Sequence, residues 1–228
     1  HLVLRRQRQM CIRDRAYSRN FGGSNWLDQR QESIKFSDRE PTVLVVGGGQ
    51  AGLAVAARLG QLEIETLVID KHDRIGDNWR KRYHSLALHN QIHVNHLPYL
   101  PFPPTWPKYI PKDMLANWFE LYAEVMQVNF WTGTELINAN YDSRLNHWVA
   151  TVRQNNNSER ILKPKHIIFA NGVSGIPYKP KLDGLCDFRG EVLHSEGFSN
   201  GAEWKGKRAA VLGTCLLYTS DAADEERG

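Results

Sequence analysis

A short glycine-rich segment limits the fold of this chain more than any other feature. Residues 47–52 read GGGQAG and fit the pattern G-x-G-x-x-G, directly after an apolar, β-branched run at residues 42–46. Such a run is typical of a parallel strand buried on both faces. The alanine-rich residues 50–59 predict a helix that stops at Gly60. A second apolar run at residues 64–70 completes a strand–helix–strand unit of about 30 residues.

The spacing of the glycines and of one acid indicates the ligand. Gly47 permits a tight turn, Gly49 lets the backbone approach a pyrophosphate, and Gly52 lets the helix and strand pack closely. The start of the helix then faces the phosphates with unpaired N–H groups. Asp70 follows the last glycine by 18 residues, where a carboxylate accepts hydrogen bonds from a ribose and repels a 2′-phosphate. This first site is therefore predicted to hold FAD or NAD, and not NADP.

The segments after Asp70 distinguish between these two cofactors. A simple dehydrogenase would continue to alternate helices and strands. Here a proline-rich stretch, residues 97–111, precedes an amphipathic pattern at residues 112–126. Three strand-like runs follow, at residues 135–142, 147–153 and 160–163, and they predict an antiparallel meander. A short buried strand at residues 166–170 ends at Asn171-Gly172, and this order resembles the FAD domain of glutathione-reductase-like flavoproteins.

Two further segments resemble the flavin-containing monooxygenases. Residues 76–89, GDNWRKRYHSLALH, are similar to the segment that this family places against FAD. Residues 188–198, FRGEVLHSEGF, fit the family signature F-x-G-x-x-x-H-x-x-x-aromatic. The signature positions are Phe188, Gly190, His194 and Phe198. A phenylalanine at the last position favours the YUCCA-like branch over the Baeyer–Villiger monooxygenases, which have tryptophan there. The resemblance extends over residues 26–213.

The resemblance implies an α/β fold, a glutathione-reductase-like FAD-binding Rossmann domain with an antiparallel meander, truncated at the start of an NADPH-binding Rossmann domain. It also implies two cofactors, FAD and NADPH. NADPH reduces FAD, and O2 adds to give a C4a-(hydro)peroxyflavin that passes one oxygen atom to a small organic substrate. The retained NADP would shield this species from water.

The same resemblance assigns roles to individual residues. The expected cofactor-binding residues are Gly47, Gly48, Gly49, Gln50, Ala51, Gly52, Asp70, Lys71, Asn78, Trp79, Arg80, His89, Asn171 and Gly172. His89 and Asn90 stand where related enzymes place a polar residue near the flavin ring, which makes them candidates for handling the oxygenated flavin. His194 is expected to couple the FAD and NADPH domains and not to act as a base.

The two ends of the chain differ from its middle. Residues 10–15, MCIRDR, and 215–225, CLLYTSDAADE, resemble translated sequencing adapters. The expected organisation begins with an artefact or disordered segment at 1–15 and a linker or extension at 16–40, with Trp26 as an aromatic anchor. The N-terminal part of an FAD-binding domain is expected at 41–204 and the first strand of a truncated NADPH-binding domain at 205–214. An artefact or disordered segment is expected at 215–228. We expect such a fragment to be inactive and to bind FAD weakly.

Composition excludes several other functions. The net charge of +4 is not gathered into a basic stripe, which argues against nucleic acid as a partner. No apolar run has the length of a membrane span. The three cysteines lack the spacing of a metal site or disulfide framework, and the histidines at 84, 89, 93 and 96 lack metal-ligating partners. We therefore expect a cytoplasmic protein without a metal, whose partners are O2 and a small molecule.

Two alternatives remain open at this point. A flavin-dependent pyridine-nucleotide oxidoreductase without oxygenation would share the glycine loop but lack the F-x-G-x-x-x-H signature. A short, non-enzymatic FAD-binding module would require a natural end near residue 228. Among single residues, we interpret Cys186 as a small buried hydrophobe. Most of the tryptophans at 79, 106, 118 and 131 are expected to pack in a core or lid.

Overall fold

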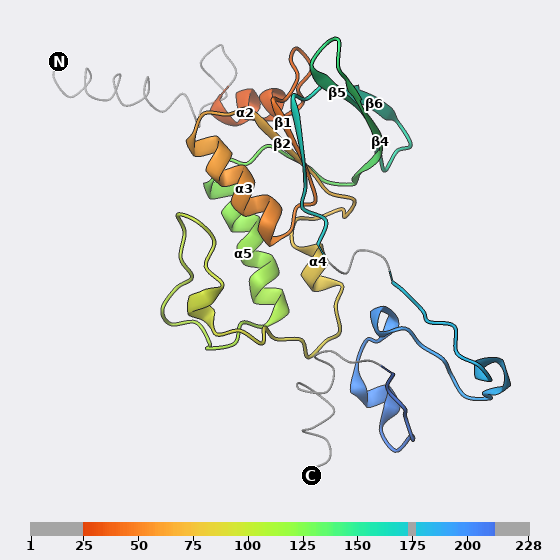
Figure 1. Cartoon of the computed structure of the whole chain (residues 1–228). Helices are drawn as coiled ribbons and strands as arrows, with labels where there is room; N and C mark the ends of the chain where they lie inside the picture. Colours follow the sequence, from red (N-terminus) through yellow and green to blue (C-terminus); the bar gives the residue numbers. More distant parts are fainter. Residues whose placement is uncertain (1–24, 173–176, 213–228) are drawn as a thin grey trace.

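The computed structural model describes residues 25–172 and 177–212 of the chain (Figure 1). In the described part, a four-stranded parallel sheet has the order β3-β2-β1-β7. Its strands are β1 (Val43–Val46), β2 (Thr66–Ile69), β3 (Phe130–Trp131) and β7 (His166–Phe169). The predicted α/β class and the strand–helix–strand unit are confirmed.

A second sheet is antiparallel and corresponds to the predicted meander. Its strands, in the order β4-β5-β6, are β4 (Thr134–Asp142), β5 (His147–Gln154) and β6 (Glu159–Leu162). The three strands begin and end within one residue of the predicted bounds. Ala150 and Val152 of β5 are fully buried, since they face the parallel sheet and not solvent.

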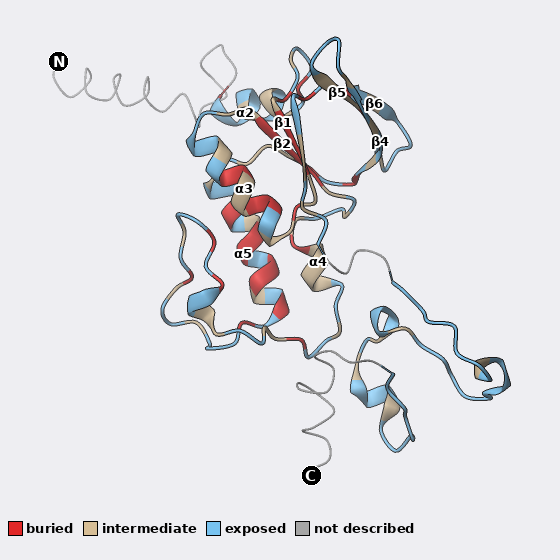
Figure 2. Ribbon diagram, viewed as in Figure 1, coloured by how far each residue is buried: buried red, intermediate tan, exposed pale blue. Residues whose placement is uncertain are grey.

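Strand β1 is apolar throughout because both of its faces are covered. Val43 and Val45 pack with Ala56 of helix α3 (Gln50–Gln61), on one side of the sheet. Leu44 points to the other side and packs against the antiparallel sheet. The parallel sheet is thus the middle layer, between helices and meander, and burial is concentrated in β1, β2, α3 and α5 (Figure 2).

Helix α3 does not stop at Gly60, as the sequence suggested, but continues to Gln61. Its end is a Schellman motif, in which Glu63 donates its backbone N–H to the carbonyl of Gly60 and Ile64 donates to the carbonyl of Leu59. The left-handed position in this motif belongs to Glu63, with φ 57°. Gly60 therefore lies in the last helical turn, where glycine is not required.

Helix α5 (Lys112–Val125) packs beside α3, with one face buried as its periodicity predicts. Tyr122 is fully buried on this face, and its hydroxyl donates to the carbonyl oxygen of Pro98 at 2.9 Å. This bond ties the helix to the proline-rich stretch. Phe102 of the same stretch is buried against Trp118, so the proline-rich residues pack against the buried face of α5.

The segment expected to be a linker is part of the fold where the structure describes it. Residues 26–34 form helix α2 (Trp26–Ile34), capped by the side chain of Asn25. The anchor is Phe36, which is fully buried beside Trp131, whereas the expected anchor Trp26 is about half exposed. Phe36 and its neighbours are held by the side chain of Arg160, which donates to the carbonyls of Lys35 and Phe36. A linker was therefore the wrong interpretation of residues 25–40.

Residues 177–212 contain the short 3-10 helices η3 (Leu185–Asp187), η4 (Ser195–Gly197) and η5 (Gly201–Trp204). Most of their side chains are exposed (Figure 2). Cys186 is exposed, so its interpretation as a buried hydrophobe was wrong. The NADPH-domain strand was expected at 205–214; its described part, residues 205–212, is exposed and forms no strand, and residues 213–214 lie outside the described residues. Two further short elements among the described residues are α4 (Asp77–Arg80) and the 3-10 helix η2 (Ile92–Val94).

Candidate functional site

The glycine loop lies at the carboxyl end of β1, between the neighbouring strands β2 and β7. Gly47 has φ +106°, and a Cβ atom there would lie 2.5 Å from the carbonyl oxygen of Ala170. A Cβ atom on Gly52 would lie 1.9 Å from the carbonyl oxygen of Gly47. These contacts agree with the predicted roles of both glycines, the tight turn and the close packing of helix on strand.

The start of α3 presents the features that a pyrophosphate needs. Gly49 is the N-cap residue and no side chain caps the helix, so its first N–H groups have no capping acceptor. A Cβ atom on Gly49 would meet, within 4 Å, only the Nδ2 atom of Asn78, at 3.2 Å. The loop is therefore open on the side from which a phosphate would approach, and these residues fit the predicted FAD.

The Asp70 carboxylate is fixed beside this loop. Its Oδ2 atom accepts the backbone N–H of Gly48 at 2.7 Å. Its Oδ1 atom accepts the backbone N–H of His72 at 2.8 Å and lies 2.7 Å from the Nδ1 atom of the same histidine. Asp70 thus keeps lone pairs for a ribose while its direction is set by two partners. Sequence reasoning missed His72, although a histidine two residues after the acid was a visible signal.

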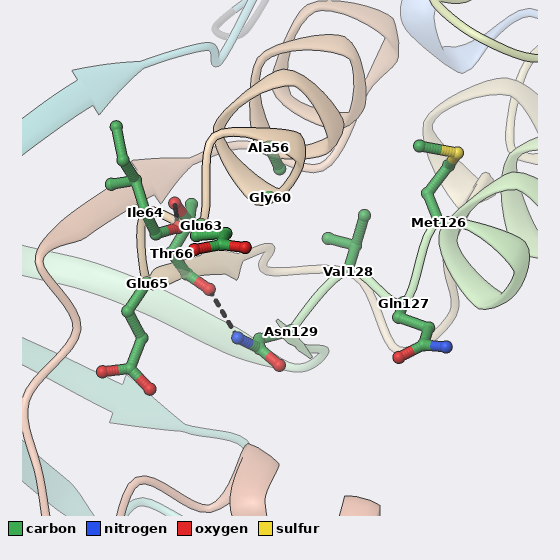
Figure 3. Close-up of a pocket in the computed structure, with 10 residues that line it drawn as sticks. All are labelled: Ala56, Gly60, Glu63, Ile64, Glu65, Thr66, Met126, Gln127, Val128 and Asn129. Atoms are coloured by element: carbon green, nitrogen blue, oxygen red, sulfur yellow. Dashed lines mark hydrogen bonds between the residues drawn. The ribbon is translucent and has the colours of Figure 1, made fainter.

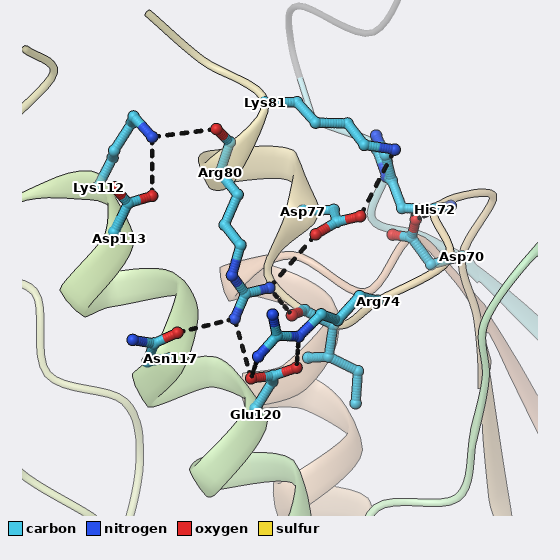
Figure 4. A network of polar contacts seen from close by, with 11 residues as sticks. Asp70, His72, Arg74, Asp77, Arg80, Lys81, Lys112, Asp113, Asn117 and Glu120 are labelled. Atoms are coloured by element: carbon cyan, nitrogen blue, oxygen red, sulfur yellow. Dashed lines mark hydrogen bonds and ion pairs between the residues drawn. The ribbon is translucent and has the colours of Figure 1, made fainter. Parts of the chain in front are cut away.

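The predicted cofactor-binding residues that follow Asp70 do not all lie at the glycine loop. Asn78 of α4 lies against the glycine loop, and the half-buried Trp79 packs against the core formed by α3 and α5. Lys71 is exposed. Arg80 was expected to bind cofactor, but its guanidinium donates to Asp77, Asn117, Glu120 and the carbonyl of Ile75 (Figure 4). Because its terminal nitrogens are occupied in this way, Arg80 connects α4 to α5 and does not reach toward the loop.

His89 and Asn90 are exposed in the loop before η2. The carbonyl of Asn90 accepts from the side chain of Asn95 at 3.2 Å, and the carbonyl of Asn95 accepts from Gln50 at 3.3 Å. Gln50, a predicted cofactor-binding residue, therefore connects this loop to the glycine loop. The contact between Gln50 and Asn95 spans 45 positions of the chain, and no local pattern predicted it.

Asn171 and Gly172 follow β7 and are exposed. Gly172 has φ +74°, a conformation that favours glycine. The carbonyl group of the preceding Ala170 is the one that approaches Gly47. The end of β7 and the glycine loop are therefore adjacent, as expected for the strand that returns to the sheet after the meander.

The family signature contacts the segment predicted to lie near FAD. The ring of Phe198 packs on that of Tyr83 with 5.9 Å between centroids, and the carbonyl of Ser199 accepts the backbone N–H of His84 at 2.8 Å. His194 caps η4, with its Nδ1 atom accepting the backbone N–H of Glu196. Phe188 and Gly190 contact each other, and Phe188 is exposed. The structure thus brings together the two segments that carried the resemblance.

A separate cavity of about 240 Å³ lies at the amino ends of strands β2 and β3, whereas the glycine loop lies at the carboxyl end of β1. Its walls come from the end of α3, the start of β2 and the residues before β3 (Figure 3). Because the glycine loop follows the carboxyl ends of the strands, this cavity is not the candidate cofactor site. Within residues 25–172 and 177–212, no three His, Cys, Asp or Glu side chains gather as metal ligands, and no helix is long and apolar enough to cross a membrane.

Comparison with known proteins first supports the type of fold. A family model described as an NAD(P)-binding Rossmann-like domain matches residues 45–105, which contain the glycine loop and Asp70. The structure resembles the flavin-containing monooxygenase from Stenotrophomonas maltophilia, with a TM-score of 0.62, 23% identity, and coverage of 72% of this chain and 48% of that one. S-allyl-L-cysteine S-oxygenase from Allium sativum gives a TM-score of 0.64 at 15% identity and covers 71% and 43%. The fold is a Rossmann-like α/β fold, which this chain shares with both of these structures.

The sequence relatives share one described activity. Over 174 residues the chain is 30% identical to indole-3-pyruvate monooxygenase YUCCA1 of Oryza sativa subsp. japonica, covering 76% of this chain and 42% of the relative. It is 31% identical over 172 residues to probable indole-3-pyruvate monooxygenase YUCCA1 of Arabidopsis thaliana, covering 75% and 41%. The chain spans about two fifths of the length of these relatives. The chain is thus similar to YUCCA-type flavin monooxygenases over about three quarters of its length, which confirms the resemblance seen in the sequence.

Proposed function

We propose that this chain forms the FAD-binding part of an FAD- and NADPH-dependent monooxygenase that inserts one oxygen atom from O2 into a small organic substrate. The observation that carries the proposal is the Asp70 carboxylate, held by Gly48 and His72 beside the open start of α3. This arrangement suits a ribose followed by a pyrophosphate. Relatives named for indole-3-pyruvate make a keto acid the first substrate class to test.

Different residues of the chain would bind different parts of FAD. The N–H groups at the start of α3, from Gln50 onward, face the pyrophosphate, and Asp70 accepts from the ribose hydroxyls. Asn78 packs at the loop and offers an amide to the phosphates. When bound, FAD supplies the electron transfer and oxygen activation, so the protein needs to position and shield it. His89, Asn90, Lys71, Trp79, Asn171 and Gly172 remain proposed contributors around this site.

The signature segment has a different role in this proposal. Phe198 and Ser199 contact Tyr83 and His84, which follow α4. A shift of the signature segment would therefore displace Tyr83 and His84, and with them the segment that follows α4. This supports a conformational role for His194 and its neighbours, which connect the FAD site with the region that would receive NADPH.

Binding of FAD by the full chain tests the proposal. We expect FAD to bind and Asp70→Ala to weaken binding at least tenfold, because hydrogen bonds to a charged group contribute about 1.5–3 kcal/mol. Isothermal titration with FAD and with NAD measures both affinities. Asp73→Ala is the matched control, since Asp73 is exposed and contacts Asn155 instead of the loop. Tight binding of NAD without binding of FAD would contradict the proposal.

A further inference from the structure

Helix α4 carries a residue to the glycine loop but has little stability of its own. It comprises four residues, Asp77–Arg80, and no side chain caps its start. A helix of this length does not form in isolation, because the cost of nucleation exceeds the gain from one turn. The Nδ2 atom of its second residue, Asn78, lies beside Gly49, 3.2 Å from where a Cβ atom on that glycine would be, on the side from which a pyrophosphate would approach. The position of Asn78 must therefore be set by contacts that α4 makes elsewhere.

The backbone before and within α4 is seated on α5. Gly76 has φ +88°, and a Cβ atom there would lie 2.5 Å from the carbonyl oxygen of Ala116. At the other end of α4, the buried Lys112 donates from Nζ to the carbonyl of Arg80 at 3.0 Å. Both contacts bring α4 against the first two turns of α5. Trp79, next to Asn78, packs against the core of α3 and α5 and also limits the rotation of α4.

A charged cluster centred on Glu120 of α5 adds further contacts that hold α4 and the residues before it on α5 (Figure 4). Arg80 donates to Glu120 Oε2 at 2.9 Å and to Asn117 Oδ1 at 3.0 Å. Arg74, just before α4, donates to the same Oε2 atom at 2.8 Å and also to Oε1. Glu120 thus accepts hydrogen bonds from Arg74, which precedes α4, and from Arg80, the last residue of α4. Hydrogen bonding to Glu120 raises the pKa of Arg74 above its ordinary value.

We propose that Glu120 is a positioning residue for cofactor binding, which fixes Arg74 and Arg80 on α5 and thereby holds Asn78 against the glycine loop. This inference rests on the proposed function, because it assigns FAD to that loop. Glu120 itself lies on the helix opposite α4 and acts through the two arginines. Without its charge, the guanidinium groups of Arg74 and Arg80 would lie close together with Asp77 as their remaining carboxylate partner in the cluster.

A double-mutant cycle on the full-length polypeptide tests whether Glu120 acts through Asn78. FAD affinity is measured by isothermal titration for the original chain, Glu120→Gln, Asn78→Ala and the double variant. We expect Glu120→Gln to weaken FAD binding about tenfold, and we expect no further loss when it is added to Asn78→Ala. Far-UV circular dichroism and thermal unfolding without FAD check that the variants fold. The matched control is Glu124→Gln, one turn further along α5, where the glutamate is exposed.

Each outcome decides between the hypotheses. Losses that multiply in the double variant, or an unchanged affinity in Glu120→Gln, would overturn the positioning role while leaving FAD binding intact. Failure of the original chain to bind FAD would instead overturn the proposed function, and the inference with it. Should Glu120→Gln not fold, Asn117→Ala removes another contact of Arg80 from an exposed position. It should weaken FAD binding about threefold, again with no added effect in Asn78→Ala.

Discussion

At the scale of single residues, Tyr122 connects burial with a measurable pH dependence. Its side chain is fully buried, and burial, with a smaller contribution from Tyr99, raises the pKa of Tyr122 to about 12. The neutral hydroxyl is the form that can donate to Pro98. In the unfolded chain the same group ionises near pH 10. The native state therefore retains the proton over an interval in which the unfolded state loses it.

The sign of the resulting stability change follows from this difference. The contribution of Tyr122 is fully present below about pH 10 and is lost as the pH rises toward about 12. We expect Tyr122→Phe to cost about 1 kcal/mol at pH 7, through the lost hydrogen bond. Between pH 10 and 12 the variant should lose roughly 2–3 kcal/mol less than the original chain. Urea unfolding at pH 7, 10 and 12 measures both, and parallel pH profiles would contradict the assignment.

At the scale of elements, helix α3 contains two glycines with opposite requirements. Gly52 faces the carbonyl oxygen of Gly47, and an added methyl group would lie 1.9 Å from it. We expect Gly52→Ala to lower the free energy of unfolding by roughly 2–4 kcal/mol and to prevent FAD binding. Thermal unfolding and isothermal titration measure these two effects.

Gly60 supplies the matched control in the same helix. A Cβ atom there meets nothing within 4 Å, and its φ angle is not positive. Gly60→Ala should therefore raise the free energy of unfolding by about 0.5–1 kcal/mol, since alanine has the higher helix propensity. A destabilised Gly60→Ala variant would show that the end of α3 needs glycine after all.

The elements also show how far local sequence patterns extend. The periodicity of residues 112–126 and the alternation in the meander predicted helices and strands within a few residues, because these patterns reflect which face each element buries. Phe36 escaped prediction because it is a single aromatic residue among polar neighbours. Its burial depends on Trp131 and Arg160, which lie far along the chain. The end of α3 was mispredicted because a glutamate occupies the left-handed position usually taken by glycine.

In the candidate site, too, some residues could be predicted from local sequence patterns and others could not. The glycine loop and Asp70 were predictable, since their spacing is set by the ligand and by one strand–helix–strand unit. Arg80 lies in a segment that resembles an FAD-binding one, yet its partners Asn117 and Glu120 are on another helix. No pattern within 76–89 could show that its guanidinium was already occupied. The role of a charged residue therefore needed the tertiary structure.

At the scale of the whole molecule, the described residues contain one well-formed dinucleotide loop. The residues expected to begin a second one, 207–212, are exposed and form no strand. We therefore expect the chain to bind FAD but not to oxidise NADPH after FAD is added. Absorbance at 340 nm follows NADPH, with free FAD as the control. Steady, protein-dependent NADPH consumption above that control would contradict the expectation.

The hydrogen bonds that hold Asp70 have a thermodynamic consequence. A carboxylate that is already directed by Gly48 and His72 loses little conformational freedom when a ribose arrives, so this end of the site is preorganised. It also cannot turn to compensate for a missing hydroxyl. A flavin dinucleotide with a deoxyribose in its adenosine half should lose nearly the full value of that hydrogen bond. Selectivity for the intact sugar is, in this sense, a property of the carboxylate's rigidity.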